Sequence, residues 1–283
     1  MDDQFVLRVA FALIPGLGGK TLARLLEHFG SLAAIQVASA SDLRAVPRIG
    51  PQMSAAIKNI DLDRTRASIE GWQSSGVSIL FQGEPPYPPL LSGLADAPPV
   101  LFYRGDISPN ETNTVALVGT RHPSAASAKL AFSLASMLSA CGWTIVSGLA
   151  AGIDAASHRG ALHGRTLALL GCGVLAPYPP ENIPLADQIM RVGALLSEVH
   201  PLAAPNSSAL VSRNRLITGI SRALIVIEAG ETSGSMHAVR FASVQNRPVY
   251  AVENVCNRHL FAAGARPVSP ATLCTDLQNV NFP

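Results

Sequence analysis

The residues best suited to chemistry in this sequence are ones that bind anions, and they gather in four short segments between residues 119 and 235. The clearest is SGLAAGID at 147–154, where Gly148 and Gly152 flank small residues after a short apolar run. Glycine lets backbone N–H groups approach a ligand closely, and the helix expected after the turn adds the positive end of its dipole. The segment therefore predicts a phosphate-binding turn, although glycines that only allow a strand to pack tightly on a helix give the same pattern.

Three further turns in this half of the chain carry glycine, hydroxyl or guanidinium groups. An arginine can bind two phosphate oxygens at once, and a serine-rich turn that opens a helix offers hydroxyl and amide donors. If the turns share one edge of a sheet, they can serve one site. The predicted phosphate-binding set is Gly119, Thr120, Arg121, Ser147, Gly148, Leu149, Gly152, Arg213, Asn214, Arg215, Ser233, Gly234 and Ser235.

The overall charge is close to balance, with 21 Lys and Arg against 19 Asp and Glu and a formal net charge of +2. A surface coated in basic residues is therefore not expected, and any affinity for nucleic acid must come from a local patch. Basic residues outnumber acidic ones between 119 and 222, where three of the four anion-binding segments begin. The basic patch and the phosphate site are thus predicted to coincide.

Signatures of catalysis are weak. The sequence has no G-x-S-x-G nucleophile elbow, no H-E-x-x-H zinc motif and no G-x-x-x-x-G-K-[ST] phosphate loop. GCG at 171–173 begins a match to the G-x-G-x-x-G/A dinucleotide fingerprint, but three prolines at 177–180 fall where the phosphate-binding helix would begin. We therefore predict no catalytic residue, no metal site and no cofactor.

Asp154 and His158 lie four residues apart on a predicted helix, so their side chains share a face and are able to pair. An aspartate at the start of a helix also caps nearby backbone N–H groups, and the histidine then only packs beside it. The sequence leaves both arrangements open.

The four cysteines, at 141, 172, 256 and 274, are far apart and form no C-x-x-C pair. This spacing indicates neither a zinc site nor a disulfide framework, so reduced thiols are expected. The N-terminus, MDDQ, is acidic where a secretion signal is basic, and no apolar run approaches the ~18 residues of a membrane span. The sequence predicts a cytoplasmic protein with no membrane association.

From residue 114 onward, short apolar runs alternate with helical patterns. The runs are at 115–118, 144–146, 166–170, 194–196, 223–227 and 249–252, and the helices between them are at about 124–140, 153–163, 183–191, 210–220 and 234–245. Near-continuous Val, Ile and Leu strands separated by helices are typical of a parallel sheet covered on both faces. We predict an extended Rossmann-like, doubly wound α/β domain with a mostly parallel sheet at 114–283, whose ligands bind beyond the carboxyl ends of the strands.

Residues 1–70 predict a small all-α domain with two related turns, IPGLGG at 14–19 and VPRIGP at 46–51. Both turns resemble the helix-hairpin-helix motif, whose N–H groups can face a phosphate, and the second carries Arg48 where the motif usually has glycine. Helical pairs of this kind also serve only for packing. Residues 71–113 are rich in proline and glycine, which predicts a connector, and the stretches at 77–80 and 100–103 have the composition of short edge strands of the α/β domain.

Several long motifs occur between about 115 and 268. They are VGTR at 118–121, SGLAAGIDAASHRGAL at 147–162, LGCG at 170–173, YPPEN at 178–182, LSE at 196–198, SRNRLITGIS at 212–221, and the segment from EA at 228–229 to SGS at 233–235. In this order they resemble the DprA/Smf family of bacterial DNA-processing proteins. The helical N-terminus is similar to the SAM-like or helix-hairpin-helix domain that precedes the family's Rossmann-like domain. Many members also carry a C-terminal winged helix, which we do not expect within this chain.

The resemblance implies a protein without enzymatic activity that binds single-stranded DNA, forms a homodimer, protects incoming DNA and helps to load the RecA recombinase during natural transformation. It implies a DNA pocket that includes Gly119, Thr120, Arg121, Gly148, Gly152, Arg213 and Arg215. Two departures fall near this pocket. Ala126-Ser127 replaces the family's usual Tyr-Gly, and the loop at 252–257 is shortened.

The main alternative is an enzyme of the related, Rossmann-like nucleotide phosphoribohydrolases, whose sheet and anion crevice are similar. Those enzymes carry P-G-G-x-G-T with a nearby catalytic glutamate, whereas the corresponding turn here, EAGETSGSMH at 228–237, has no glutamate after Ser235. A third hypothesis is a sensor that binds a small nucleotide in the same pocket.

Overall fold

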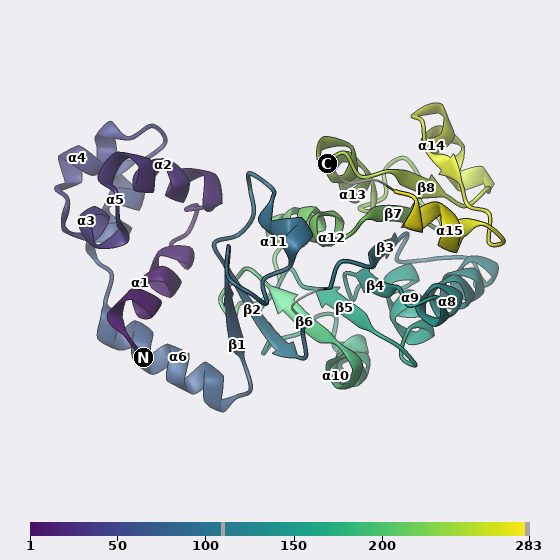
Figure 1. Ribbon diagram of the computed structural model, residues 1–283, viewed down its shortest axis with the longest axis horizontal. Helices are drawn as coiled ribbons and strands as arrows, with labels where there is room; N and C mark the ends of the chain where they lie inside the picture. The colour runs from purple at the N-terminus through teal and green to yellow at the C-terminus, as the bar shows by residue number, and fades with distance from the viewer. Residues whose placement is uncertain (109–110, 281–283) are drawn as a thin grey trace.

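The computed structural model of the chain describes residues 1–108 and 111–280. Helices come first, and Figure 1 shows them at one end of the molecule, beside the larger α/β domain. Side chains cap several of them: Asp2 accepts a hydrogen bond from Phe5 N at 2.7 Å, and Ser31, Ser39 and Asp61 act in the same way. These helices are α1 (Asp3–Ala12), α2 (Gly19–Phe29), α3 (Leu32–Val37), α4 (Ala40–Ala45), α5 (Pro51–Lys58) and α6 (Leu62–Ser74).

Both predicted hairpins form. The first joins α1 to α2, and the second joins α4 to α5. Gly16 and Arg48 occupy corresponding positions in the two turns, with φ angles of 80° and 72°. This left-handed conformation is easily adopted by glycine and costs free energy for arginine, which explains why the motif favours glycine there.

The α/β domain is built on one sheet with the strand order β1-β2-β6-β5-β4-β3-β7-β8-β9. Neighbours from β6 to β9 pair in parallel, whereas β2 pairs antiparallel with both β1 and β6. The predicted mostly parallel, doubly wound α/β fold is confirmed. The strands are β1 (Ser78–Phe81), β2 (Val100–Gly105), β3 (Thr114–Val118), β4 (Thr144–Ser147), β5 (Thr166–Leu169), β6 (Ala194–Ser197), β7 (Ala223–Val226), β8 (Val249–Ala251) and β9 (Arg266–Pro267).

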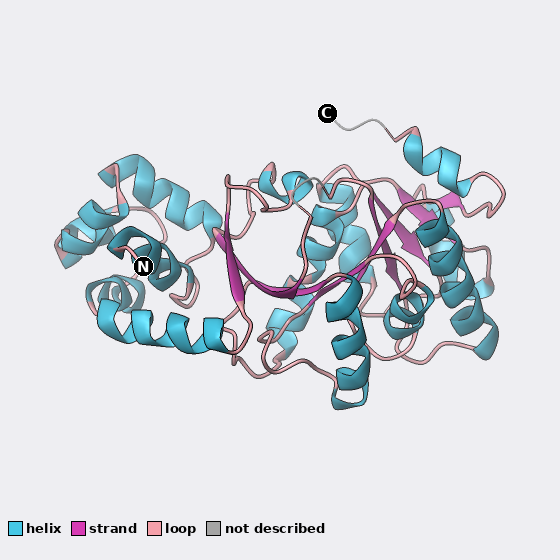
Figure 2. Cartoon of the chain, turned by 60° about the horizontal axis from the view of Figure 1, so that its bottom comes forward, coloured by secondary structure: helices cyan, strands magenta, loops and turns pink. Residues whose placement is uncertain are grey.

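Helices cover both faces of the sheet, as Figure 2 shows. They are α7 (Pro89–Ser92), α8 (Ala125–Ala140), α9 (Ile153–Gly160), α10 (Ile183–Val192), α11 (Ser207–Ser212), α12 (Asn214–Ile220), α13 (Met236–Val244), α14 (Arg258–Ala262) and α15 (Leu273–Gln278). Alternate residues of β3 join different cores: Ala116 and Val118 pack with α12 and α13, while Val115 and Leu117 pack with α8 and α9. Burial on both faces explains why the strands read as continuous apolar runs. No helix in the described part of the chain is long and apolar enough to cross a membrane.

The segment predicted as a connector with edge strands contributes two strands, β1 and β2. In the antiparallel pair β1 and β2, Leu80 lies opposite Leu101, and β2 extends the sheet from β6. The helical domain packs on this edge, where the ring centroids of Trp72 and Phe102 lie 5.6 Å apart. Aromatic packing therefore attaches the helical domain to the sheet.

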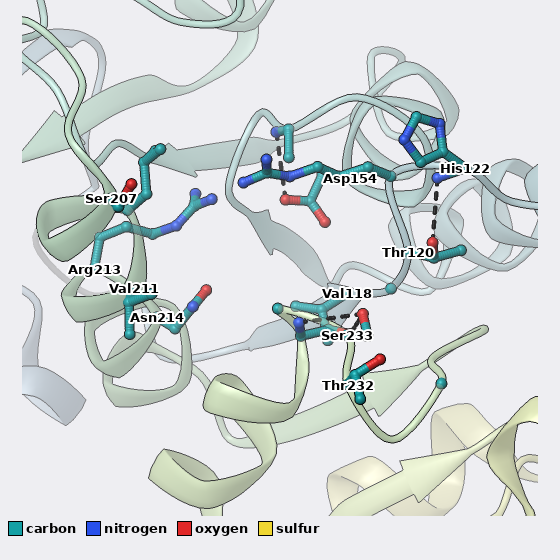
Figure 3. Close-up of a pocket in the computed structure, with 17 residues that line it drawn as sticks. Val118, Thr120, His122, Asp154, Ser207, Val211, Arg213, Asn214, Thr232 and Ser233 are labelled. Carbon is teal, nitrogen blue, oxygen red and sulfur yellow. Dashed lines mark hydrogen bonds between the residues drawn. The ribbon is translucent and has the colours of Figure 1, made fainter.

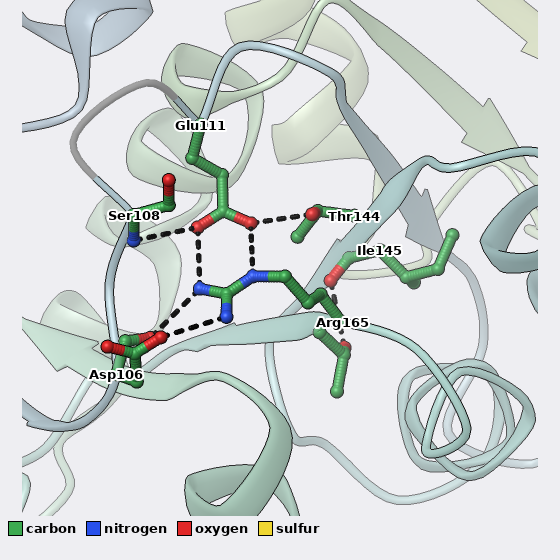
Figure 4. A network of polar contacts seen from close by, with 7 residues as sticks. Asp106, Ser108, Glu111, Thr144, Ile145 and Arg165 are labelled. Carbon is green, nitrogen blue, oxygen red and sulfur yellow. Dashed lines mark hydrogen bonds and ion pairs between the residues drawn. The ribbon is translucent and has the colours of Figure 1, made fainter.

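A polar network holds the end of this segment to the main sheet (Figure 4). Glu111 accepts hydrogen bonds from Thr144 Oγ1 at 2.6 Å and Arg165 Nε at 2.9 Å, and Arg165 Nη1 donates to Asp106 at 3.0 Å. The hydrogen bond with Glu111 raises the pKa of Arg165 above its usual value. Because Thr144 begins β4 and Arg165 precedes β5, the network lies at the amino ends of the strands, away from the edge where ligands are expected.

The expectation of four reduced thiols is wrong for two of them. Cys141, at the end of α8, forms a disulfide with Cys274 of α15, across 133 residues of sequence. The pair becomes adjacent only because Leu273 and Leu277 of α15 join the core that α8 shares. Sequence spacing alone does not contain that contact.

Candidate functional site

The carboxyl ends of β3 and β7 meet where the order of the strands reverses. From β3 the chain adds β4, β5 and β6 on one side, and then returns to the other side to add β7. In open α/β sheets, such a reversal leaves a crevice outside the two strand ends. A cavity of about 550 Å³ lies at this point (Figure 3). Its lining residues are Val118, Gly119, Thr120, Arg121, His122, Ala150, Asp154, Ser207, Leu210, Val211, Arg213, Asn214, Gly230, Thr232, Ser233, Gly234 and Ser235.

Most of the predicted phosphate-binding residues line this crevice. Those that do are Gly119, Thr120, Arg121, Arg213, Asn214, Ser233, Gly234 and Ser235. Gly148 lines a smaller adjoining pocket of about 240 Å³, which also contains Arg121 and Arg213. Four residues of the predicted set line neither space: Ser147, Leu149, Gly152 and Arg215. The structure thus brings together the turns after β3 and β7 and the start of α12.

The turn after β4 is occupied by its own aspartate. Asp154 Oδ2 accepts hydrogen bonds from Gly148 N at 3.2 Å and Ala150 N at 3.4 Å. His158 is turned elsewhere, with its Nδ1 2.7 Å from Thr166 Oγ1. Of the two arrangements that the sequence allows, the aspartate cap is therefore the one that forms, and the N–H groups of Gly148 and Ala150 are already used.

Two glycines let the neighbouring turns pack together. A Cβ on Gly152, whose φ is 78°, would lie 2.5 Å from Thr120 O, and a Cβ on Gly119 would lie 2.6 Å from Ile153 Cγ1. Backbone hydrogen bonds join the same turns, from Ile153 N to Thr120 O at 3.2 Å and from Thr120 N to Glu228 O at 2.7 Å. Gly152 therefore supports the crevice from behind without lining it.

Arg213 places a buried positive charge where the crevice meets the adjoining pocket. It lies between α11 and α12, where the helix predicted over 210–220 is broken, and it is 5% exposed. Nη1 donates to Leu169 O at 2.6 Å, whereas Nε has no hydrogen-bond partner among the described residues. Burial lowers the pKa of Arg213, and the nearby charge of Asp154 opposes this effect. A buried guanidinium whose donors are incompletely used favours an anionic ligand.

Arg121 is the exposed counterpart of Arg213. It follows β3, and it lines both the crevice and the adjoining pocket. Its charge is close enough to lower the pKa of Arg213, in addition to the larger effect of burial. An anion bound beside both guanidinium groups would be attracted by each of them and would offset the repulsion between the two positive charges.

The backbone N–H and hydroxyl groups of Ser124, which precedes α8, already bind a carboxylate. Glu228 Oε2 accepts hydrogen bonds from Ser124 N at 3.3 Å and Ser124 Oγ at 3.1 Å. Hydrogen bonds from Ser127 and Ser124 lower the pKa of Glu228. Ala126-Ser127, which replaces the family's usual Tyr-Gly, thus lies in the first turn of α8. This turn is held to the segment after β7 by the hydrogen bonds between Ser124 and Glu228.

Arg215 does not face the crevice. It forms an ion pair with Glu198, and the two side chains are only 15% and 20% exposed. Burial raises the pKa of Glu198, while the charge of Arg215 counteracts that rise. The placement of Arg215 in a DNA pocket therefore has no support from its position, and its side chain instead neutralises a partly buried carboxylate.

Several lining residues were missed by the sequence analysis. His122 directly follows Arg121, and Tyr178, which is 41% exposed in the adjoining pocket, belongs to the YPPEN motif, so both had a usable signal. The residues of α11 did not, because nothing in the sequence of this short helix distinguishes a side chain that faces the crevice from one that packs in the core. They are Ser207, Leu210 and Val211.

Comparison with known proteins agrees with this architecture. The chain matches the family described as DNA recombination-mediator protein A over residues 78–280 and a helix-hairpin-helix motif over residues 8–64. Protein Smf of Synechocystis sp. is 36% identical over 256 residues, which cover 87% of this chain and 64% of that protein. The chain thus spans slightly less than two thirds of the length of this relative.

Two solved structures are similar over most of their own length. DNA processing protein A from Streptococcus pneumoniae superposes with a TM-score of 0.82 at 28% identity, covering 100% of this chain and 99% of that one. DNA processing protein A from Helicobacter pylori, solved to describe its mode of single-stranded DNA binding, gives a TM-score of 0.65 at 27% identity, covering 73% of this chain and 97% of that one.

Proposed function

The chain belongs to the family of DNA recombination-mediator protein A, and we propose that its crevice binds single-stranded DNA. The observation that carries this proposal is the position of Arg121 and buried Arg213, side by side at the reversal point of the sheet and in one crevice with the turn at Ser233 and Ser235. Guanidinium groups and a serine-rich helix start are donors suited to phosphate oxygens. The ligand is therefore held through its backbone, without a need for one base sequence.

The dimensions of the site favour a single strand. A cavity of about 550 Å³ has the size of a site for one small ligand or nucleotide unit, and a pocket of about 240 Å³ adjoins it. Tyr178, exposed in that pocket, offers a ring on which an unpaired base can stack. Bases in a duplex are not available for such stacking, so duplex DNA gains less from this surface.

The test is binding to single-stranded oligonucleotides of graded length, with duplex of the same sequence as control. Affinity should rise with length until the site is filled and should fall with salt, each neutralised phosphate adding roughly 0.7 to the slope of log affinity against log salt. Duplex should bind more weakly. Equal affinity for duplex, or no response to salt, would count against the crevice as a single-strand site.

The wider role we propose is that of a cytoplasmic homodimer that protects incoming DNA and helps to load the RecA recombinase during natural transformation. Support comes from membership of a recombination-mediator family. Light scattering at micromolar concentration tests the dimer. Strand exchange by RecA on DNA pre-coated with a single-strand binding protein tests the loading role, which predicts a shorter lag when this protein is added.

We also propose that the protein acts without catalysis. Among the described residues that line the crevice, Asp154 is the one carboxylate, and it is held by the N–H groups of Gly148 and Ala150. A phosphoribohydrolase-like enzyme would release free base from nucleoside monophosphates, and a nucleotide sensor would bind a mononucleotide with an affinity that longer strands do not improve. Incubation with the four monophosphates, followed by chromatography and titration, separates these alternatives from strand binding.

A further inference from the structure

The glycines of the 171–173 turn have a structural use that the dinucleotide fingerprint does not explain. A Cβ on Gly171 would lie 2.7 Å from Leu210 Cα, and a Cβ on Gly173 would lie 2.0 Å from Pro201 O. Gly173 N also donates to Ala203 O at 2.9 Å. Both glycines therefore allow the chain at 200–210 to approach the end of β5, in the place where a dinucleotide fold would admit a pyrophosphate.

This close approach positions α11, an unusual helix. Its start is capped by Asn206, whose Oδ1 accepts a hydrogen bond from Ala209 N at 2.8 Å, and it has no buried residue. Leu210 and Val211 nevertheless face the crevice, and Val211 is 36% exposed. Figure 3 shows Val211 on the side of the cavity opposite Thr120 and Ser233. Packing of the α11 backbone against Gly171 thus positions the apolar side chains of Leu210 and Val211 at the solvent-accessible crevice.

Given the proposed binding of single-stranded DNA, on which this inference rests, we propose that the Leu210 and Val211 face of α11 contacts the nucleobases of the bound strand. Leu210 and Val211 line the crevice together with the donors Arg213 and Asn214, and Figure 3 shows Val211 on the same side of the cavity as these two residues. A nucleotide presents the matching pair of groups, an anionic phosphate and an adjacent apolar base face. These apolar side chains add nothing to the binding of phosphate alone, whereas a base packed on them removes apolar surface of both partners from water.

The probe that separates base contact from phosphate contact is an abasic strand. The parent protein should bind oligo-dT more tightly than an abasic oligonucleotide of equal length and charge. The variant Leu210→Ala/Val211→Ala should lose on the order of tenfold in affinity for oligo-dT, corresponding to a few buried methylene groups, and should bind the abasic strand as the parent does. Its salt slope should stay unchanged, because no phosphate contact is removed.

Two variants control this experiment. Val37→Ala removes an equally apolar side chain, 78% exposed on α3, and should leave both affinities unchanged. Gly171→Ala pushes the backbone of Leu210 away and should reproduce the loss of oligo-dT affinity without removing any side chain from α11. Melting temperatures of all variants establish that they are folded at the temperature of measurement.

The outcomes are distinct. Equal affinity of the parent for oligo-dT and the abasic strand, or a double variant that loses both equally, overturns the base-contact proposal while leaving strand binding intact. Failure of the parent to bind either strand overturns the proposed function itself. Selective loss of oligo-dT binding in both the double variant and Gly171→Ala supports the assignment of α11 as the base-contacting wall.

Discussion

The guanidinium of Arg213 occupies the space that a side chain on Gly148 would need. A Cβ built on Gly148 would lie 1.7 Å from Nη1 and 2.1 Å from Cζ of Arg213. The glycine of the SGLA turn is therefore required for seating a buried arginine, and its N–H group is bonded to Asp154. The turn contributes to an anion site indirectly, by fixing the cation.

Gly148→Ala should consequently weaken DNA binding without removing any charge. The new methyl group displaces the Arg213 guanidinium from Leu169 O, and we expect affinity for oligo-dT to fall by about tenfold or more, with a lower melting temperature from strain in a packed region. Gly230→Ala is the matched control, because it lies in the same crevice with nothing within 4 Å of its Cβ position. Fluorescence anisotropy measures both. If the two variants bind alike, Arg213 does not depend on Gly148.

Arg121→Ala should weaken binding and spare the fold. The side chain is exposed, and loss of one charged hydrogen-bonded contact costs about 1.5 to 3 kcal/mol, or roughly ten- to a hundredfold in affinity. The salt slope should become shallower, and the melting temperature should match the parent's. Arg191→Ala, an exposed arginine at the end of α10, controls for the loss of one charge. Normal binding by Arg121→Ala would move the DNA path away from the β3 turn.

Arg215→Ala should show the opposite behaviour. It leaves the partly buried carboxylate of Glu198 without its partner, which typically costs about 1 to 3 kcal/mol, so the melting temperature should drop by a few degrees while affinity at low temperature is kept. Adding Glu198→Gln should recover part of the loss, because a neutral amide is cheaper to bury than a charge. Differential scanning calorimetry and anisotropy give the two readouts. Loss of affinity at unchanged stability would instead make Arg215 a DNA contact.

His158 should make the protein less stable in mild acid. Thr166 Oγ1 donates to Ile145 O at 2.8 Å, so it accepts from His158 Nδ1–H, and Nε2 remains as a buried acceptor without a partner among the described residues. Burial, followed by the charge of Arg213, lowers the pKa of His158 from 6.5 to about 3. His158 is therefore protonated below about pH 6.5 in the unfolded chain, but only below about pH 3 in the folded chain.

Stability should thus be full above pH 6.5 and should fall with pH between these two values, by about 1.4 kcal/mol for each unit. Urea unfolding at pH 7 and pH 5 measures the change. His158→Gln removes the effect of this histidine on the pH dependence of stability. Burial raises the pKa of Asp154, so Asp154 changes stability with pH in the opposite direction. The difference between the parent and the variant therefore reports the histidine alone. An identical pH profile in both proteins would contradict a buried neutral histidine.

Reduction of the Cys141–Cys274 disulfide should destabilise the protein. The bond closes a segment of 133 residues, and a cross-link of that length contributes on the order of 4 to 5 kcal/mol by restricting the unfolded chain. Thermal unfolding with and without dithiothreitol tests this, since Cys141 is exposed to the reagent. Cys141→Ser should melt like the reduced parent and should not respond to dithiothreitol. A parent that melts identically in both conditions would show that α15 is held by Leu273 and Leu277 alone.

Much of the fold could be predicted from the sequence because its signals are local. Alternating strand and helix patterns specify the doubly wound class, and the near-continuous apolar composition of strands such as β3 reflects burial on both faces. Residues that directly follow a strand could also be assigned to the crevice, as for Gly119 after β3, because the carboxyl ends of parallel strands share one edge. The wall formed by α11 could not, since its helical pattern has no buried face.

Only the tertiary structure decided which candidate donors remain for a ligand. Arg213 and Arg215 are two residues apart and look equivalent in the sequence, but the first turns to Leu169 at the end of β5 and the second to Glu198 after β6. Residues so spaced at the start of a helix point to different sides of it, and each side meets a different distant strand. The N–H group of Gly148 was likewise committed by the fold, to Asp154. Burial and pairing are set by contacts between segments far apart in the chain, which local residue patterns do not encode.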